Sequence, residues 1–172
     1  MGILHKLKLT LPYSALLTVY SSLILPYITY AIETWHGSPK YLQNQLFILQ
    51  KKAIRAIFNL PYNFHTNNYF KDARLLKLEE IFQVCSCTQI YQALNSNSHF
   101  LKSFLRSHYE ISHLNTRNSA QLTLPICRKS QTKEAFLFTS IKNWNALPSF
   151  VKNAKSAGSF KARIKNHYLS TY

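Results

Sequence analysis

The chain has 172 residues, and 47% of them are hydrophobic, which is enough for a packed core in one domain or two small ones. Only three residues are Gly, which argues against a sandwich or barrel built from many tight hairpins and favours a helical fold. Lys and Arg outnumber Asp and Glu by 21 to 6, and the net charge of +15 makes nucleic acid or an anionic membrane surface the expected partner.

The first 35 residues are expected to form a helix, a break and a second helix. Pro26 lies inside an apolar stripe and is expected to kink or break the helix. The stripe recurs at three- and four-residue steps and is formed by Leu16, Val19, Tyr20, Leu23, Tyr27 and Ala31.

The uncharged stretch Ala15–Ile32 approaches the length of a membrane-spanning helix. Its Ser, Thr and Tyr residues and the central Pro26 argue against insertion. It also lacks the dense apolar run and small-residue cleavage site of a signal peptide. A buried helix pair is therefore the favoured interpretation, and a membrane partner is not expected.

Residues Pro39–Asn59 are predicted to form an amphipathic helix. The predicted buried stripe consists of Leu42, Leu46, Leu49, Ala53 and Ile57. The opposite face carries Lys40, Asn44, Lys51 and Arg55, and a second contact surface is expected from Phe47, Ile54 and Phe58.

Two further helices are expected after the connector Leu60–Asn68. A short helix would run to Arg74 with Thr66 as its N-cap. A long helix is predicted for Leu78–Asn95, with a buried side formed by Ile81, Val84, Cys85, Thr88 and Tyr91.

The rest of the chain shows less regular patterns. His99–Leu105 is predicted to be a short helix, Ser107–Gln121 a loop, and "QLTLPIC" (Gln121–Cys127) one short strand. Helices are expected for Glu134–Leu147 and Ser159–Leu169, the latter capped by Ser156 or Ser159. The fold class is thus mainly α, with a helical region at 1–106 and a loop-rich region at 107–172 that ends in a basic amphipathic helix.

No catalytic or metal site is predicted. Asp72 is the only aspartate, whereas two-metal phosphoryl chemistry needs several converging carboxylates. Cys85 and Cys87 would point in nearly opposite directions on a helix, so buried thiols are expected rather than metal ligands. Three cysteines provide no secreted disulfide framework, which favours an intracellular location, nuclear or cytoplasmic.

The candidate nucleic-acid contacts are two groups of cations. Lys51, Lys52 and Arg55 lie on the predicted basic helix, and a phosphate contact and an ordinary solvated face are equally compatible with them. Lys161, Arg163 and Lys165 lie in the C-terminal helix, where the solvated face is favoured. Aromatic and turn residues are expected to act as structural anchors, namely Trp35, Trp144, Leu147, Pro148 and Phe160.

Five motifs, in order along the chain, resemble the region that follows the reverse transcriptase palm in non-LTR retrotransposons of the jockey-like, LINE class. Leu11–Trp35 is similar to a Leu- and Tyr-rich stretch that ends in Trp, and "LQKKAIRAIFN" (Leu49–Asn59) to a basic helix of the form L-Q-K-[KR]-A-[IV]-R. "HTNNYFKDARLLKLEEIF" (His65–Phe82) and "NTRN" (Asn115–Asn118) resemble the next two elements. "WNALPSFVKNAKSAGSFKARIK" (Trp144–Lys165) resembles the family's ending.

The resemblance implies a helical, thumb-like bundle and the C-terminal region of an RNA-directed DNA polymerase. The family's catalytic aspartate pair lies in the palm, which this chain lacks, so the chain is expected to be a truncated copy that is inactive alone. The implied partners are an RNA/DNA duplex and the missing palm and fingers, with no small-molecule substrate. The parent enzyme implies Mg²⁺, but no cofactor is expected in this chain.

Two alternatives stay open from the sequence. One is a helical protein-interaction module without a nucleic-acid role. The other is a small membrane-anchored basic protein that uses Ala15–Ile32.

Overall fold

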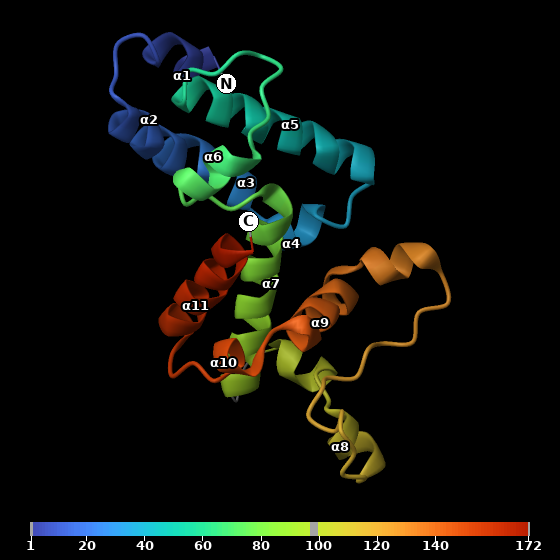
Figure 1. Ribbon diagram of the computed structural model, residues 1–172. Coiled ribbons are helices and arrows are strands. Elements are labelled where there is room, and N and C mark those ends of the chain that lie inside the picture. The colour runs from blue at the N-terminus through green and yellow to red at the C-terminus, as the bar shows by residue number, and fades with distance from the viewer. Residues whose placement is uncertain (1, 97–99, 172) are drawn as a thin grey trace. The chain divides into compact units, whose positions relative to one another are not determined.

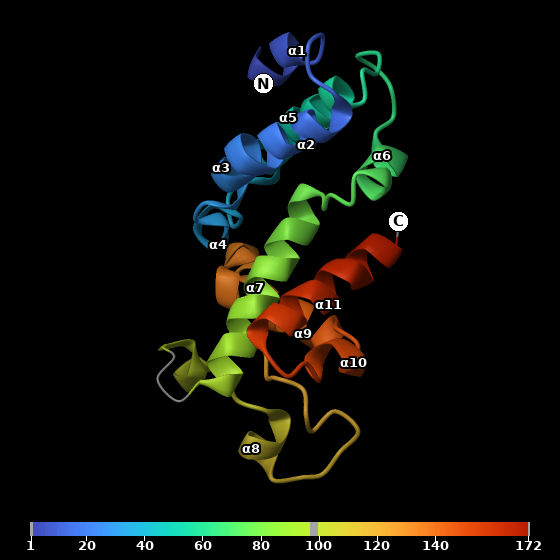
Figure 2. The same ribbon diagram turned by 90° about the vertical axis from the view of Figure 1, so that its left-hand side faces the viewer.

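A computed structural model describes residues 2–96 and 100–171 (Figures 1 and 2). The protein is mainly α-helical, as predicted, and the described residues contain no strand. The chain forms two compact units, Met1–Phe82 with Asn166–Tyr172, and Gln83–Lys165. The units therefore divide inside the long helix α7, and the division predicted after residue 106 lies within the second unit.

The first unit is built around helix α5, beside which α1 and α2 pack (Figure 1). Its helical elements are α1 (Gly2–Leu7), α2 (Tyr13–Val19), a π-helical turn (Tyr20–Ile24), α3 (Leu25–Thr29), α4 (Ile32–Trp35), α5 (Lys40–Ile57), α6 (Asn67–Asp72) and the start of α7 (Leu78–Asn95). Its core includes the fully buried side chains of Leu4, Tyr20, Ile54 and Phe70.

The π-helical turn explains why the predicted stripe of the N-terminal helix is only partly right. The turn precedes Pro26, which lacks a backbone N–H, and Leu25 N–H bonds to Tyr20 O across five residues. Pro26 thus sits in the first turn of α3 without breaking the helical run. The wider turn moves the inward position by one residue, from the predicted Tyr27 to Ile28, and Tyr27 is 84% exposed.

Helix α5 is rotated relative to the predicted orientation of its faces. Leu42 and Leu49, expected in the core, are 39% and 41% exposed, whereas Ile54, expected beside the polar side, is fully buried. Ala53 and Ile57 are buried as predicted. Apolar periodicity alone could not locate the inner face, because two glutamines, Gln43 and Gln50, are also buried on α5.

The buried glutamines are held by hydrogen bonds. Gln50 Nε2 donates to Tyr20 Oη at 3.1 Å and to Leu76 O at 2.9 Å. Gln43 Nε2 donates to the carbonyls of His36 and Ser38. These bonds satisfy the amide N–H groups and favour the side of α5 that faces inward, while Gln50 Oε1 is buried without a hydrogen-bond partner.

His36 connects the corner before α5 to the start of α7. Its ring is 5% exposed and stacks on Phe82 with ring centroids 3.5 Å apart. Its Nε2 lies 3.1 Å from Glu79 Oε2. This hydrogen bond lowers the pKa of the Glu79 carboxyl from its ordinary value of 4.5, while partial burial opposes the shift.

The second unit packs its helices around the rest of α7, with α9 and α11 beside it (Figures 1 and 2). Its other elements are a 3₁₀ turn (Phe100–Phe104), α8 (His108–Ser112), a second 3₁₀ turn (Ser130–Glu134), α9 (Phe136–Ala146), α10 (Ser149–Lys152) and most of α11 (Ala157–Ser170). Tyr91 stacks on Phe160 at a centroid distance of 4.6 Å, and Trp144 lies 5.7 Å from the same ring. Ser156 Oγ accepts from Ser159 N–H, so Ser156 is the cap of α11.

Helix α7 has the predicted bounds but is buried more widely than its predicted stripe. Ile81, Val84 and Tyr91 are buried as expected. Cys87 and Ile90, which lie outside that stripe, are fully buried as well. A helix that is apolar on most sides is typical of a central position in a fold.

The predicted strand Gln121–Cys127 is wrong. Leu122 makes only an isolated antiparallel bridge with Ser107. On its other side, Leu122 is hydrogen-bonded to the Asn145 side chain and not to a neighbouring strand. Asn145 Oδ1 accepts from Leu122 N–H at 3.0 Å, and Asn145 Nδ2 donates to Leu122 O at 2.8 Å. These two bonds pair the backbone of Leu122, while Thr123 N–H bonds to Arg106 O at 2.8 Å and Gln121 O accepts from His108 N–H at 3.0 Å.

The predicted loop Ser107–Gln121 contains the short helix α8. Ser107 and Glu110 form a capping box, in which each side chain accepts from the other residue's backbone N–H. The S-x-x-E spacing was a sequence signal for this helix, which is too short to show periodicity. The helix predicted at His99–Leu105 is a 3₁₀ turn at Phe100–Phe104, and His99 lies outside the described residues.

No helix in the described part of the chain combines the length and the apolar character needed to cross a membrane. The stretch Ala15–Ile32 is instead divided among α2, the π-helical turn, α3 and the start of α4.

The orientation of α5 predicts unequal effects of two truncations on one helix. Ile54→Ala should lower the free energy of unfolding by about 2–5 kcal/mol, because it opens a cavity in the core. Leu49→Ala, the matched control, should cost less than about 1 kcal/mol, since Leu49 is 41% exposed. Urea unfolding followed by circular dichroism measures both, and a larger loss for Leu49→Ala would contradict the described orientation.

The Glu79–His36 contact predicts a pH-dependent effect of Glu79→Gln. Because the folded-state pKa is lowered, the stability that Glu79 contributes is complete above pH 4.5 and is lost as the pH falls through the folded value. At pH 6 the variant should be less stable by only about 0.5 kcal/mol, since the Glu79 side chain is 54% exposed. Thermal melts from pH 6 to pH 3 should show this difference shrinking, and a constant difference would refute the linkage.

Candidate nucleic-acid interface

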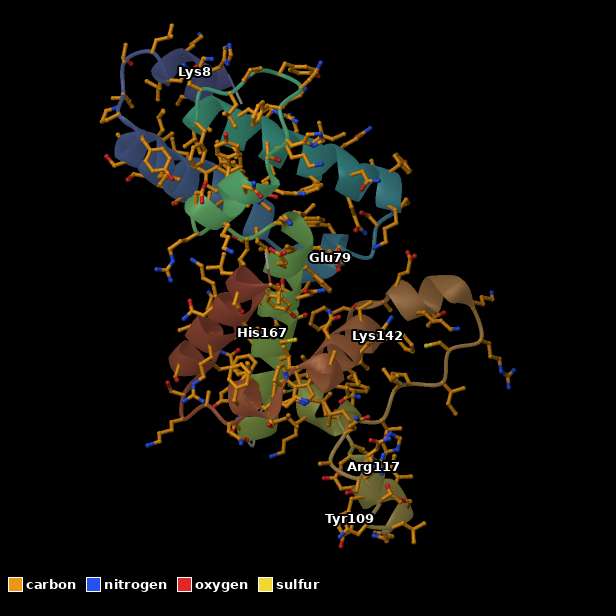
Figure 3. All side chains as sticks on the ribbon, viewed as in Figure 1. Lys8, Glu79, Tyr109, Arg117, Lys142 and His167 are labelled. Atoms are coloured by element: carbon orange, nitrogen blue, oxygen red, sulfur yellow. The ribbon has the colours of Figure 1, made fainter. Side chains whose placement is uncertain are left out.

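A basic cavity of about 520 Å³ lies in the first unit between α1, the C-terminal half of α5 and the connector after it. We call it the basic pocket. Lys8 directly follows α1 at one edge (Figure 3). The lining residues are Gly2, His5, Lys8, Lys52, Arg55, Ala56, Leu60 and Tyr62.

The end of α5 positions two of these cations. Asn59 adopts a left-handed conformation with φ of 51°, and Leu60 N–H bonds to Arg55 O at 2.8 Å, as in a Schellman motif. Asn59 Oδ1 then accepts from Lys8 Nζ at 3.2 Å. Arg55 Nε donates to Phe64 O at 3.0 Å. Lys8 is therefore bonded to the side chain at the turn that closes α5, and Arg55 to the backbone of the connector that follows.

The pocket is strongly electropositive. Three formal cations, Lys8, Lys52 and Arg55, line it together with His5, and no carboxylate is among the lining residues that the structure describes. They lie near the helix C-terminus, where the negative end of the macrodipole offsets part of their charge. The sequence has only six acidic residues against 21 cations, so the uncompensated charge is large.

Several acidic side chains take part in local structure elsewhere. Glu79 bonds to His36, Glu80 Oε2 accepts from Lys77 N–H at 2.8 Å, and Glu110 belongs to the capping box. These carboxylates therefore bind groups at the starts of helices and the ring of His36. None of these three glutamates lines the basic pocket.

The structure brings Lys52 and Arg55 together at the pocket but places Lys51 elsewhere. Lys51 Nζ lies 4.3 Å from the centroid of the Phe47 ring, in a cation–π contact, and Lys51 does not line the pocket. Lys8, His5 and Tyr62 were not predicted as site residues. No periodic pattern links them to α5, because α1 and the connector reach the pocket only through the tertiary fold.

The C-terminal cations lie on the exposed side of α11. Lys161, Arg163 and Lys165 are exposed, while Phe160 and Ile164 on the same helix are fully buried. Arg163 Nη1 donates to Phe150 O at 2.9 Å and to Asn153 O at 3.1 Å. Arg163 therefore satisfies carbonyls at the end of α10.

The other anchor residues differ in burial. Trp144 and Leu147 are 8% and 5% exposed, and Pro148 is half-buried just before α10. Trp35 is half-buried, and its Nε1 donates to Tyr30 O at 3.0 Å. Trp35 thus lies at a surface.

That surface is an apolar groove of about 840 Å³ in the first unit. It contains the leucines of α5 that the sequence had predicted to be core. Its lining residues are Ile3, Leu23, Ile24, Tyr27, Ile28, Trp35, Ser38, Leu42, Leu46 and Leu49. The rotation of α5 leaves Leu42 and Leu49 exposed on this groove, and the π-helical turn leaves Tyr27 exposed beside them.

The metal-ligating residue types and the buried thiol Cys87 are distributed among the described residues as follows. No group of three or more His, Cys, Asp or Glu side chains among them could hold a metal ion. Burial raises the pKa of the Cys87 thiol to about 12, so it stays protonated at neutral pH. Burial also lowers the pKa of Lys152, whose Nζ donates to Asn145 O.

Comparison with known protein families, with curated proteins and with solved structures gives no match to this chain.

The contacts of Arg163 predict a structural role that its exposed neighbour lacks. Arg163→Ala should lower the free energy of unfolding by about 1 kcal/mol, because two carbonyls lose a charged donor. Lys161→Ala, which removes the same charge from the same helix, should change it by less than about 0.5 kcal/mol. Equal losses in urea denaturation would contradict the assigned role.

Proposed function

We propose that this chain corresponds to the thumb and C-terminal region of a non-LTR retrotransposon reverse transcriptase and has non-specific affinity for a nucleic-acid duplex. The observation that carries the binding proposal is the basic pocket, where Lys8, Lys52 and Arg55 converge with no carboxylate among the described lining residues. The five ordered motifs support the family assignment.

The proposed mechanism is electrostatic. Lys and Arg side chains neutralise phosphates and release the counterions condensed on the duplex, which favours binding at low salt. Phosphate contacts carry no base information, so the affinity should be similar for unrelated sequences. The net charge of +15 would add long-range attraction to any polyanion.

Within the parent polymerase, the chain would grip the template–primer duplex while the palm supplied the chemistry. No residue of this chain is assigned a catalytic role. The partners in this proposal are the RNA/DNA duplex and the palm and fingers of the polymerase, and the proposed compartment is nuclear or cytoplasmic.

The second candidate is a helical protein-interaction module, and the apolar groove favours it. We assign to the groove an apolar helix of another protein with acidic side chains at its edges. A second copy of this chain is a poor occupant, because two molecules of charge +15 repel each other. Exposed Tyr27 and Leu23 would be the first contacts.

The proposed binding is tested by the salt dependence of affinity for a blunt DNA duplex. The double variant Lys8→Gln/Lys52→Gln removes two of the pocket's cations. The slope of log K against log[salt] should then shrink by up to about 0.9 for each lost phosphate contact. Fluorescence anisotropy with two unrelated duplex sequences measures the slope.

The matched control is Lys161→Gln/Lys165→Gln, which removes the same net charge from exposed positions of α11. Its slope should stay close to that of the wild type. An equal decrease in both variants would refute the basic pocket as the interface. Absence of wild-type binding at low salt would reject the nucleic-acid proposal and favour the interaction module.

A further inference from the structure

We infer that the basic pocket receives one unpaired nucleotide of a nucleic-acid strand, with its phosphate among Lys8, Lys52 and Arg55 and its base against the ring of Tyr62. This inference rests on the proposed nucleic-acid binding and specifies the ligand of the same site.

The aromatic wall of the pocket is the first observation. Tyr62 is 72% exposed, although large aromatic side chains usually gain stability by burial. Lys52 Nζ lies 5.7 Å from the centroid of its ring. An exposed aromatic ring beside a cation can stack on a nucleobase while the cation meets the adjoining phosphate.

The local fold holds Tyr62 in this position. The connector that carries it leaves α5 through the Schellman motif at Asn59 and turns again where Phe64 N–H bonds to Pro61 O at 3.1 Å. Arg55 Nε donates a hydrogen bond to Phe64 O, at the end of this second turn. The ring and the cations are thus presented by one hydrogen-bonded corner, which reduces the entropy lost on binding.

The concave shape of the site is the second observation. A cavity of about 520 Å³ falls within the roughly 300–1,000 Å³ typical of pockets for small ligands. A duplex presents its phosphates on a convex outer surface, and its stacked bases cannot offer a free face to Tyr62. A nucleotide outside the stack can enter the cavity with both its base and its phosphate.

The lining residues suit both the base and the phosphate of a nucleotide. Ala56 and Leu60 provide apolar surface beside Tyr62, and Lys8, Lys52 and Arg55 provide the cations. A free mononucleotide carries the same two groups. A strand gains in addition from the attraction of its neighbouring phosphates to the charge of +15, so a strand is the assigned ligand.

The test compares three DNA ligands that carry the same duplex, by fluorescence anisotropy with the full chain. One is blunt, one has a four-nucleotide single-stranded overhang, and one has an overhang of the same length made of abasic residues, which keeps the phosphates and removes the bases. The wild type should bind the normal overhang at least about 5-fold more tightly than the abasic one, the lower end of what stacking of one base contributes.

Substitutions then assign this preference to one ring. Tyr62→Leu should abolish the preference for the normal overhang, whereas Tyr62→Trp should retain it. Tyr41→Leu is the matched control, because Tyr41 is 63% exposed on α5 and does not line the pocket. A loss of preference in Tyr41→Leu equal to that in Tyr62→Leu would overturn the assignment.

The outcomes separate this inference from the proposed function. Equal wild-type affinity for the normal and abasic overhangs, with salt-dependent duplex binding intact, would overturn the nucleotide pocket and leave the proposed function standing. Absence of binding to all three ligands would overturn both. Displacement of the overhang by adenosine monophosphate at equal concentration would overturn the assignment to a strand.

Discussion

The buried amide of Gln50 is the interaction on which the first unit depends. Its two hydrogen bonds join α5 to Tyr20 in the π-helical turn and to the Leu76 carbonyl before α7. A buried amide nitrogen without acceptors would cost more than each bond contributes, so these two bonds favour the observed rotation of α5, although Gln50 Oε1 is buried without a partner. Once that rotation is set, Ile54 enters the core, while Leu42 and Leu49 turn toward the apolar groove.

The shortage of carboxylates shapes the surface in a comparable way. Glu79, Glu80 and Glu110 each hold a corner or a helix start. Few acids therefore remain to pair with 21 cations, and the protein is left with a strong positive field. The fold concentrates part of that field where the end of α5 meets Lys8. A site of this kind attracts phosphate without a catalytic group, which is consistent with a binding role.

The candidate site was only partly predictable from the sequence. Lys52 and Arg55 were among the predicted contacts, and they lie three residues apart on α5, so both reach the same side of the helix. Lys51 was included with them, yet its ammonium lies over Phe47, since one residue along a helix changes direction by about 100°. Lys8 and Tyr62 were not predicted as site residues, because they lie on segments outside α5 and only the tertiary fold brings them to the pocket. The hydrogen bonds of Asn145 were not predicted for the same reason, since its partner Leu122 lies 23 positions away in the sequence.

The sequence by itself determined the helical class, the bounds of α7, those of α5 to within two residues, and the excess of positive charge. These properties follow from local propensity, periodicity and composition, which neighbouring residues carry among themselves. Only the tertiary structure decided which face of α5 is buried, where the π-helical turn shifts the inward positions, and which cations share a pocket. Those outcomes depend on hydrogen-bond partners and packing contacts between distant segments, and no local pattern encodes them.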